Sequence, residues 1–160
     1  MKLYHYAPQQ NTIMTDGLIS FAGGCGDIRP YIKRAGSQNR QDIITWMENC
    51  FPGRSRSLSV ITEPVQWQGN DPMLKEFVDT HTLFSIELDD LLHDNLIESI
   101  WCQENNALFK IIPSEIDTSP LPWKNCSRRQ GLFFGVIRHY FLVLRDGRIS
   151  PNYLKKENTP

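Results

Sequence analysis

The sequence lacks the features that mark several large classes of protein. The 160-residue chain contains no apolar run near the roughly 18 residues of a membrane span, and its first ten residues lack the apolar core of a secretory signal. Its 17 basic and 18 acidic residues nearly cancel, so any attraction to nucleic acid or anionic membrane needs a local patch. We therefore expect a cytoplasmic protein without a membrane segment, with one domain over residues 1–154 and a polar tail over 155–160.

Cysteine motifs are also missing. The four cysteines, Cys25, Cys50, Cys102 and Cys126, are widely spaced and form no C-x-x-C pair. This spacing argues against a zinc site, a redox motif and a disulfide framework. We predict reduced thiols and no metal; a lone catalytic cysteine is an alternative without local support.

Hydrophobic periodicity predicts an α+β fold with a mainly antiparallel sheet of five to seven short strands, and with helices concentrated in the N-terminal half. Strands are expected over residues 2–7, 57–61, 82–88, 106–112, 139–144 and 148–151. Helices are expected from Pro8 or Asn11 to Gly17, over 40–50, and from Asp71 as N-cap through 78, with a short helical turn over 89–94.

Two connections carry composition signals of their own. Residues 20–39 are rich in glycine and polar side chains, which predicts a long loop. The pair Asp146-Gly147 between extended runs predicts a β-hairpin. The apolar run 132–137 fits a buried helix by composition, but its aromatic and β-branched residues favour strand.

Three stretches resemble the ADP-ribosyltransferase superfamily. Residues 3–20, LYHYAPQQNTIMTDGLIS, are similar to an opening strand with a histidine followed by an I…GL helix, as DNA-modifying toxins of the group also have. Residues 55–65, SRSLSVITEPV, resemble the short central strand that ends in a Ser or Thr facing nicotinamide. Residues 82–92 with 141–154 resemble the closing half of tRNA 2′-phosphotransferases, whose I-P-P-x-Y pattern stands here as 149–153, ISPNY.

The resemblance implies a split, mainly antiparallel β-sheet around a cleft for NAD, with NAD as the cofactor. It implies a toxin- or effector-like enzyme that transfers ADP-ribose to a protein or nucleic acid, and a partner or antitoxin protein is an accompanying expectation. One departure bears on catalysis. Typical members carry a glutamate on a late strand, but no acidic residue lies between Asp117 and Asp146, and the corresponding strand offers Arg138, His139 and Tyr140. A non-catalytic binding or inhibitor protein on the same fold, or an RNA 2′-phosphotransferase-like enzyme, is therefore kept as an alternative.

The opening strand supplies the first site residues. His5 is expected to donate a hydrogen bond to a ribose hydroxyl, because one imidazole nitrogen can donate while the other is held by a neighbour. The alternative is a half-buried histidine satisfied by backbone. Tyr6 is expected to stack on nicotinamide, although strand alternation places it opposite His5 and a plain core role is the alternative.

The remaining site residues are expected at the nicotinamide end, at phosphates and at the ribose. Ser59 and Thr62 would line the nicotinamide end, although serines are also common on edge strands. Phosphates would meet Arg54, Arg56 and Arg138, because arginine binds phosphate bidentately. The alternatives are a solvated basic turn for the first two and an open sheet face for Arg138. Glu63 could replace the missing late glutamate by stabilising positive charge on the ribose, with Glu104 as second choice; a surface carboxylate is the alternative for Glu63.

Overall fold

A computed structural model describes residues 1–9, 12–25, 27–64, 72–104, 107–117 and 139–158 of the chain. The sequence predictions for Asp71, Cys126, the run 132–137 and Arg138 concern residues outside these ranges.

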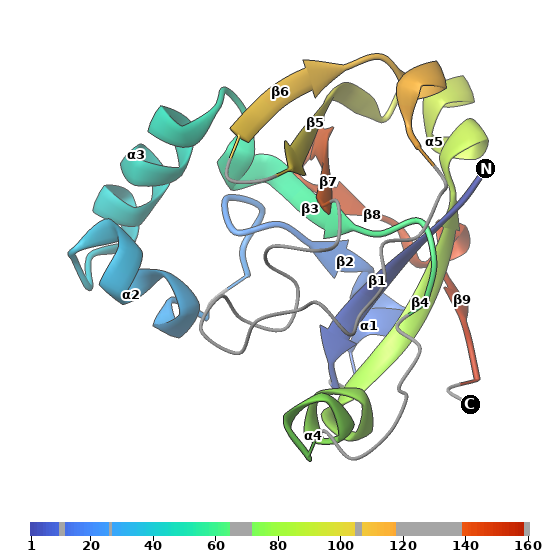
Figure 1. Ribbon diagram of the computed structural model, residues 1–160, viewed down its shortest axis with the longest axis horizontal. Helices are drawn as coiled ribbons and strands as arrows, with labels where there is room; N and C mark the ends of the chain where they lie inside the picture. The colour runs from blue at the N-terminus through green and yellow to red at the C-terminus, as the bar shows by residue number, and fades with distance from the viewer. Residues whose placement is uncertain (10–11, 26, 65–71, 105–106, 118–138, 159–160) are drawn as a thin grey trace.

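The described strands form three sheets in which every pairing is antiparallel (Figure 1). Their spatial orders are β1-β4-β9, β2-β8 and β3-β7-β5-β6. The strands are β1 Lys2–Pro8, β2 Leu18–Ile19, β3 Ser57–Val60, β4 His81–Glu87, β5 Ile97–Glu104, β6 Ala107–Ile111, β7 His139–Leu144, β8 Arg148–Ile149 and β9 Lys155–Lys156. The α+β class and the mainly antiparallel pairing predicted from the sequence are confirmed.

The helices are short and lie around these sheets (Figure 1). They are α1 Ile13–Asp16, α2 Arg29–Ala35, α3 Arg40–Cys50, α4 Pro72–Thr80 and α5 Leu88–His93, with single 3₁₀ turns η1 Arg54–Arg56, η2 Pro113–Glu115 and η5 Pro151–Tyr153. Helix α5 follows β4 directly, where the sequence predicted a helical turn. It lies outside the N-terminal half, in which the helices were expected to concentrate.

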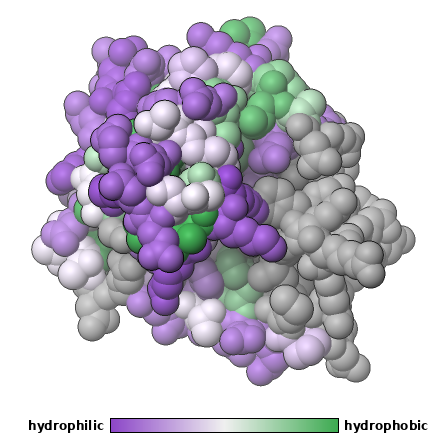
Figure 2. Space-filling model, turned by 90° about the vertical axis from the view of Figure 1, so that its left-hand side faces the viewer, coloured by the Kyte–Doolittle hydropathy of each residue, from purple (hydrophilic) through white to green (hydrophobic). Residues whose placement is uncertain are grey.

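Helix α3 has the bounds that the sequence predicted. The side chain of Asn39 caps it by accepting hydrogen bonds from the backbone N–H groups of Gln41 and Asp42. Its apolar face buries Ile43 and Met47 against a small cluster around Phe21. The end of the molecule that carries α2 and α3 presents mainly hydrophilic residues to solvent (Figure 2). Helix α3 is thus amphipathic and attached by one face.

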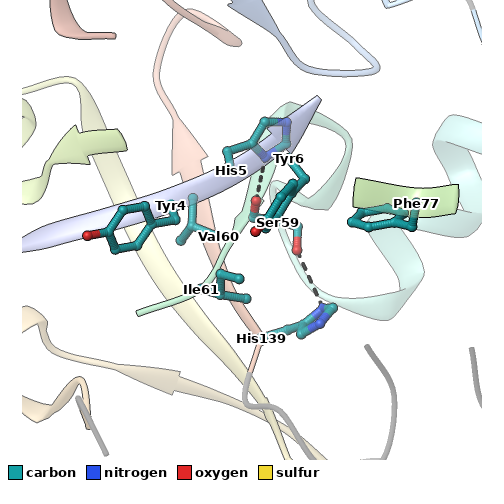
Figure 3. A pocket seen from close by; sticks show the side chains of 8 residues that line it. All are labelled: Tyr4, His5, Tyr6, Ser59, Val60, Ile61, Phe77 and His139. Atoms are coloured by element: carbon teal, nitrogen blue, oxygen red, sulfur yellow. Dashed lines mark hydrogen bonds between the residues drawn. The ribbon is translucent and has the colours of Figure 1, made fainter. Parts of the chain in front are cut away.

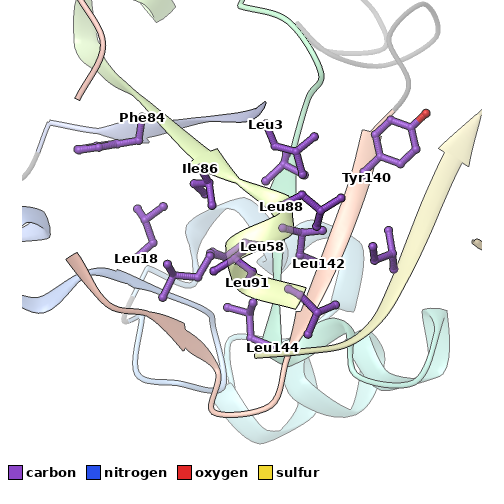
Figure 4. Close-up of a cluster of buried hydrophobic side chains, with 14 of the residues drawn as sticks. Leu3, Leu18, Leu58, Phe84, Ile86, Leu88, Leu91, Tyr140, Leu142 and Leu144 are labelled. Atoms are coloured by element: carbon purple, nitrogen blue, oxygen red, sulfur yellow. The ribbon is translucent and has the colours of Figure 1, made fainter. Parts of the chain in front are cut away.

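The main core lies between the three-stranded and the four-stranded sheets (Figure 4). Strand β7 is buried along its whole length because it is central in its sheet and both of its faces are covered. Tyr140, Leu142 and Leu144 point into the main core, where Leu3 and Leu91 also lie. This double burial explains why its sequence reads as a continuous apolar run.

The opposite face of the four-stranded sheet is covered by the segment that follows α3. Phe51 stacks on Trp101, with ring centroids 4.9 Å apart, and packs at 5.4 Å against Phe141. Gly53, at φ +87°, allows this segment to pass close to Val143. Phe141 and Val143 of β7 are therefore held on this face in a third, smaller cluster with Phe51.

Several local predictions were wrong. The described ranges contain nine strands, where five to seven were expected. The expected loop 20–39 contains α2, which ends at the left-handed Gly36. The turn at Gly147 is present, but β8 pairs with β2 instead of β7, so no hairpin forms. The backbone N–H of Ser20 donates to the Gly147 carbonyl at 2.8 Å, which ties the turn to the other segment. Strands β2 and β5 were not predicted, and the segment 155–160, expected as a polar tail outside the domain, contributes β9.

Candidate functional site

The three-stranded and four-stranded sheets meet where β1 approaches β3. Tyr4 and Ile61 form one antiparallel bridge, with N–O distances of 2.8 and 2.9 Å. At the next position the imidazole of His5, and not a backbone group, reaches the Ser59 carbonyl, at 2.7 Å from Nδ1. A side chain inserted between two strands holds them farther apart than a backbone ladder would. The sheets therefore separate at His5.

A cavity of about 150 Å³ opens at this separation (Figure 3). The described residues that line it are Tyr4, His5 and Tyr6 of β1, Ser59 and Val60 of β3 with the adjacent Ile61, Phe77 of α4, and His139 of β7. A cavity of that size accepts one aromatic ring. The ring of Tyr6 packs on Phe77 at 5.3 Å between centroids, so one wall is aromatic.

Side chains from both faces of β1 line the cavity, because it lies against the edge of the strand beyond the Tyr4–Ile61 bridge (Figure 3). His5 and Tyr6 therefore share one cavity even though strand alternation puts them on opposite faces. The sequence correctly placed the two residues on opposite faces and singled out both, but it could not show that an edge would bring them together.

The hydrogen bond to Ser59 fixes the tautomer of His5. A carbonyl only accepts, so Nδ1 carries the proton and Nε2 of the neutral ring is an acceptor. Burial lowers the pKa of His5; the bond to the Ser59 carbonyl opposes this shift, and nearby His81 adds to it. The contact to the Ser59 carbonyl matches the alternative given for His5, a histidine satisfied by backbone. In the neutral ring, Nε2 can accept a hydrogen bond but cannot donate one, so the predicted donor role does not fit this tautomer.

His139 is a second imidazole in the cavity, and the sequence interpretation did not select it. It is the first residue of β7, buried, with Nδ1 3.4 Å from Ser59 Oγ. Burial lowers its pKa to about 4, so the ring is neutral at pH 7. Alternation along β7 could have revealed it, since Tyr140 faces the core and its neighbour must face the other way.

The two arginines expected at phosphates lie outside the cavity lining. The guanidinium carbon of Arg54 lies 5.0 Å from the Trp46 ring centroid and 5.5 Å from that of Phe141, as in cation–π contacts. Arg56 pairs with Glu98 at 2.7 Å and donates to the Leu144 carbonyl at 3.0 Å. Glu98 also raises the pKa of Arg56. Arg56 therefore links η1 to β5 and β7.

The carboxylates proposed from the sequence do not reach the cavity. Glu63 is exposed, and neither it nor Thr62 belongs to the described lining. Glu104, the second choice, ends β5 and is also outside that lining. Arg138, proposed as catalytic, lies outside the described residues. Over the described part of its wall the cavity thus contains hydroxyls, imidazoles and apolar groups, and no carboxylate.

Comparison with known protein families, with curated proteins and with solved structures found no match to this chain. Within the described ranges, no three His, Cys, Asp or Glu side chains gather as metal ligands would. Cys25 and Cys50 are thiols outside any disulfide. None of the helices seen in the described segments has the length and apolar character needed to cross a bilayer.

Proposed function

We propose that this chain is an ADP-ribosyltransferase-like protein that binds NAD at the cavity and transfers ADP-ribose to a macromolecular target, a protein or a nucleic acid. One observation supports this most. His5 and Ser59, singled out from two separate stretches of sequence, meet at 2.7 Å across 54 residues of chain and line the same ring-sized cavity.

The volume of the cavity decides which part of NAD it would take. About 150 Å³ suffices for one aromatic ring, so the nicotinamide enters and the rest of the dinucleotide lies outside. The faces of Tyr6 and Phe77 attract a cationic pyridinium, and neutral His5 and His139 do not repel it. The Nε2 atom of His5 then accepts a hydrogen bond from a hydroxyl of the attached ribose.

Arg54 is the remaining described candidate for a phosphate contact. It lies over Phe141, which is paired directly with Ser59, so the guanidinium and the cavity lie on the same face of the sheet. The guanidinium of Arg54 makes cation–π contacts, and within the described residues it takes part in no ion pair. Arg56, in contrast, is already paired with Glu98. Guanidinium groups bind phosphate oxygens well, so Arg54 is the better candidate for the pyrophosphate.

A non-catalytic binding or inhibitor protein on the same fold is the second candidate. Sugar transfer passes through a positively charged, oxocarbenium-like centre that enzymes usually stabilise with a carboxylate. The described lining provides none. In this case the chain binds NAD, or a group that resembles its nicotinamide half, without transferring ADP-ribose. It acts by binding to and inhibiting a partner protein.

Calorimetry with NAD tests the proposal. We expect wild type to bind NAD and His5→Ala to weaken the affinity about tenfold, the equivalent of one hydrogen bond. His93→Ala is the matched control, because His93 is an exposed histidine on α5. Wild type that fails to bind NAD would refute the proposal. Labelled NAD with a cell lysate then separates the candidates: transfer of label supports the enzyme, and binding without transfer supports the inhibitor.

A further inference from the structure

Ser59 is held by two imidazoles that come from different sheets. His5 of β1 binds its carbonyl at 2.7 Å, and His139 of β7 lies 3.4 Å from its hydroxyl (Figure 3). The edge of the His139 ring meets Phe141, with centroids 6.3 Å apart. Since β7 is central in its sheet, His139 stands on a rigid element with its ring fixed on two sides.

The two histidines of the cavity have different capacities for proton transfer. Nδ1 of His5 is committed to the Ser59 carbonyl, and its Nε2 accepts from the ribose in the proposed complex. His139 faces the cavity on the side of the Ser59 hydroxyl. With a pKa of about 4 it has roughly the basicity of an ordinary carboxylate, but it is neutral before it takes a proton.

We propose that His139 is the general base of the transfer reaction, in the place where a carboxylate is otherwise expected; this rests on the proposed function. The bond between the nicotinamide nitrogen and the ribose carbon breaks, and its electron pair leaves with neutral nicotinamide. The attacking hydroxyl forms a new bond from its oxygen to that carbon, and its proton passes to the imidazole of His139. The positive charge of the pyridinium ends on the imidazolium, so charge is conserved.

The experiment measures nicotinamide release from NAD with water as the acceptor, in parallel with NAD binding by calorimetry. His139→Asn is the main variant, because its amide can keep the contact to Ser59 Oγ but cannot take a proton. We expect its rate to fall about 100-fold or more, the usual contribution of a general base, with affinity for NAD within about threefold of wild type. His93→Asn is the matched control and should keep the wild-type rate.

Chemical rescue separates a base from a structural side chain. His139→Ala leaves a space of the size of an imidazole, and we expect added imidazole to restore at least a tenth of the wild-type rate. A purely structural role predicts no rescue. The thermal melt of each variant confirms that it is folded, and His139→Asn alone decides the question if the alanine variant is not.

Three results would overturn the inference while NAD still binds: no nicotinamide release by wild type, a rate for His139→Asn within threefold of wild type, or no rescue of a folded His139→Ala. Absence of NAD binding by wild type would instead refute the proposed function itself. The failure of the base and the failure of the binding site are therefore distinct outcomes.

Discussion

Burial of His139 makes the stability of the fold depend on pH. The folded state holds its pKa at about 4, while an unfolded chain returns it to the ordinary value of 6.5. Between these values the unfolded state binds more protons, so the free energy of unfolding rises with pH. The contribution is complete above pH 6.5 and is lost as pH falls toward 4.

The magnitude follows from the two pKa values. A difference of 2.5 units corresponds to about 3 kcal/mol in full, and the part lost between pH 7 and pH 5 is about 2 kcal/mol. Burial also lowers the pKa values of His5 and His81, so they add losses of the same sign. His93 has the opposite sign, because Asp94 raises its pKa, and it is exposed.

Denaturant titrations at pH 7 and pH 5 measure this effect. We expect His139→Asn to reduce the loss of unfolding free energy between the two pH values by about 2 kcal/mol relative to wild type. Only the change with pH is compared, so a uniform destabilisation by the substitution does not enter. His93→Asn should lose at least as much unfolding free energy between pH 7 and pH 5 as wild type does. An unchanged pH dependence in His139→Asn would refute the assignment of a neutral, buried imidazole.

Three other substitutions test the packing and the two arginines. Gly53→Ala places a Cβ 2.4 Å from a methyl of Val143 at φ +87°, and we expect thermal melts to show a loss of about 1–3 kcal/mol. Arg56→Met removes the partner of Glu98 and should cost about 1 kcal/mol in denaturant titrations while calorimetry shows unchanged NAD affinity. Arg54→Met should weaken NAD binding at least threefold and reduce its salt dependence; an unchanged affinity would contradict the phosphate contact.

The elements that the sequence predicted correctly carry their own local signals. Helix α3 has an N-cap at Asn39 and an apolar face through Ile43 and Met47, and both act within eleven residues. Strands β1 and β3 alternate, and β7 is an uninterrupted apolar run. Such features need no distant partner, so composition and spacing were sufficient to predict them.

The elements that were missed depend on distant contacts. Helix α2 is only seven residues long, and the cluster that includes Phe21 and Met47 holds its Tyr31 in place. The predicted hairpin at Gly147 does not form, because β8 pairs with β2, which lies more than a hundred residues earlier in the chain. A dipeptide that favours a turn does not specify with which strand the following residues pair.

The candidate site shows the same division. Sequence patterns singled out His5, Tyr6 and Ser59, which converge. Alternation along β7 could place His139 on the face opposite Tyr140, but its approach to Ser59 depends on the register in which Ser59 lies opposite Phe141. The sequence patterns also predicted that Arg56 contacts a phosphate. In the structure Arg56 pairs with Glu98, which lies on β5, a strand that the sequence did not predict.

Burial keeps His5 and His139 uncharged at pH 7, and it also weakens the screening of a charge placed between them. A pyridinium placed among these rings opposes their protonation, since like charges raise each other's free energy. Bound NAD should therefore depress both imidazole pKa values further and widen the pH range of stability. A neutral ligand of the same shape lacks this coupling, so the acid stability of the complex reports the charge of the ring in the cavity.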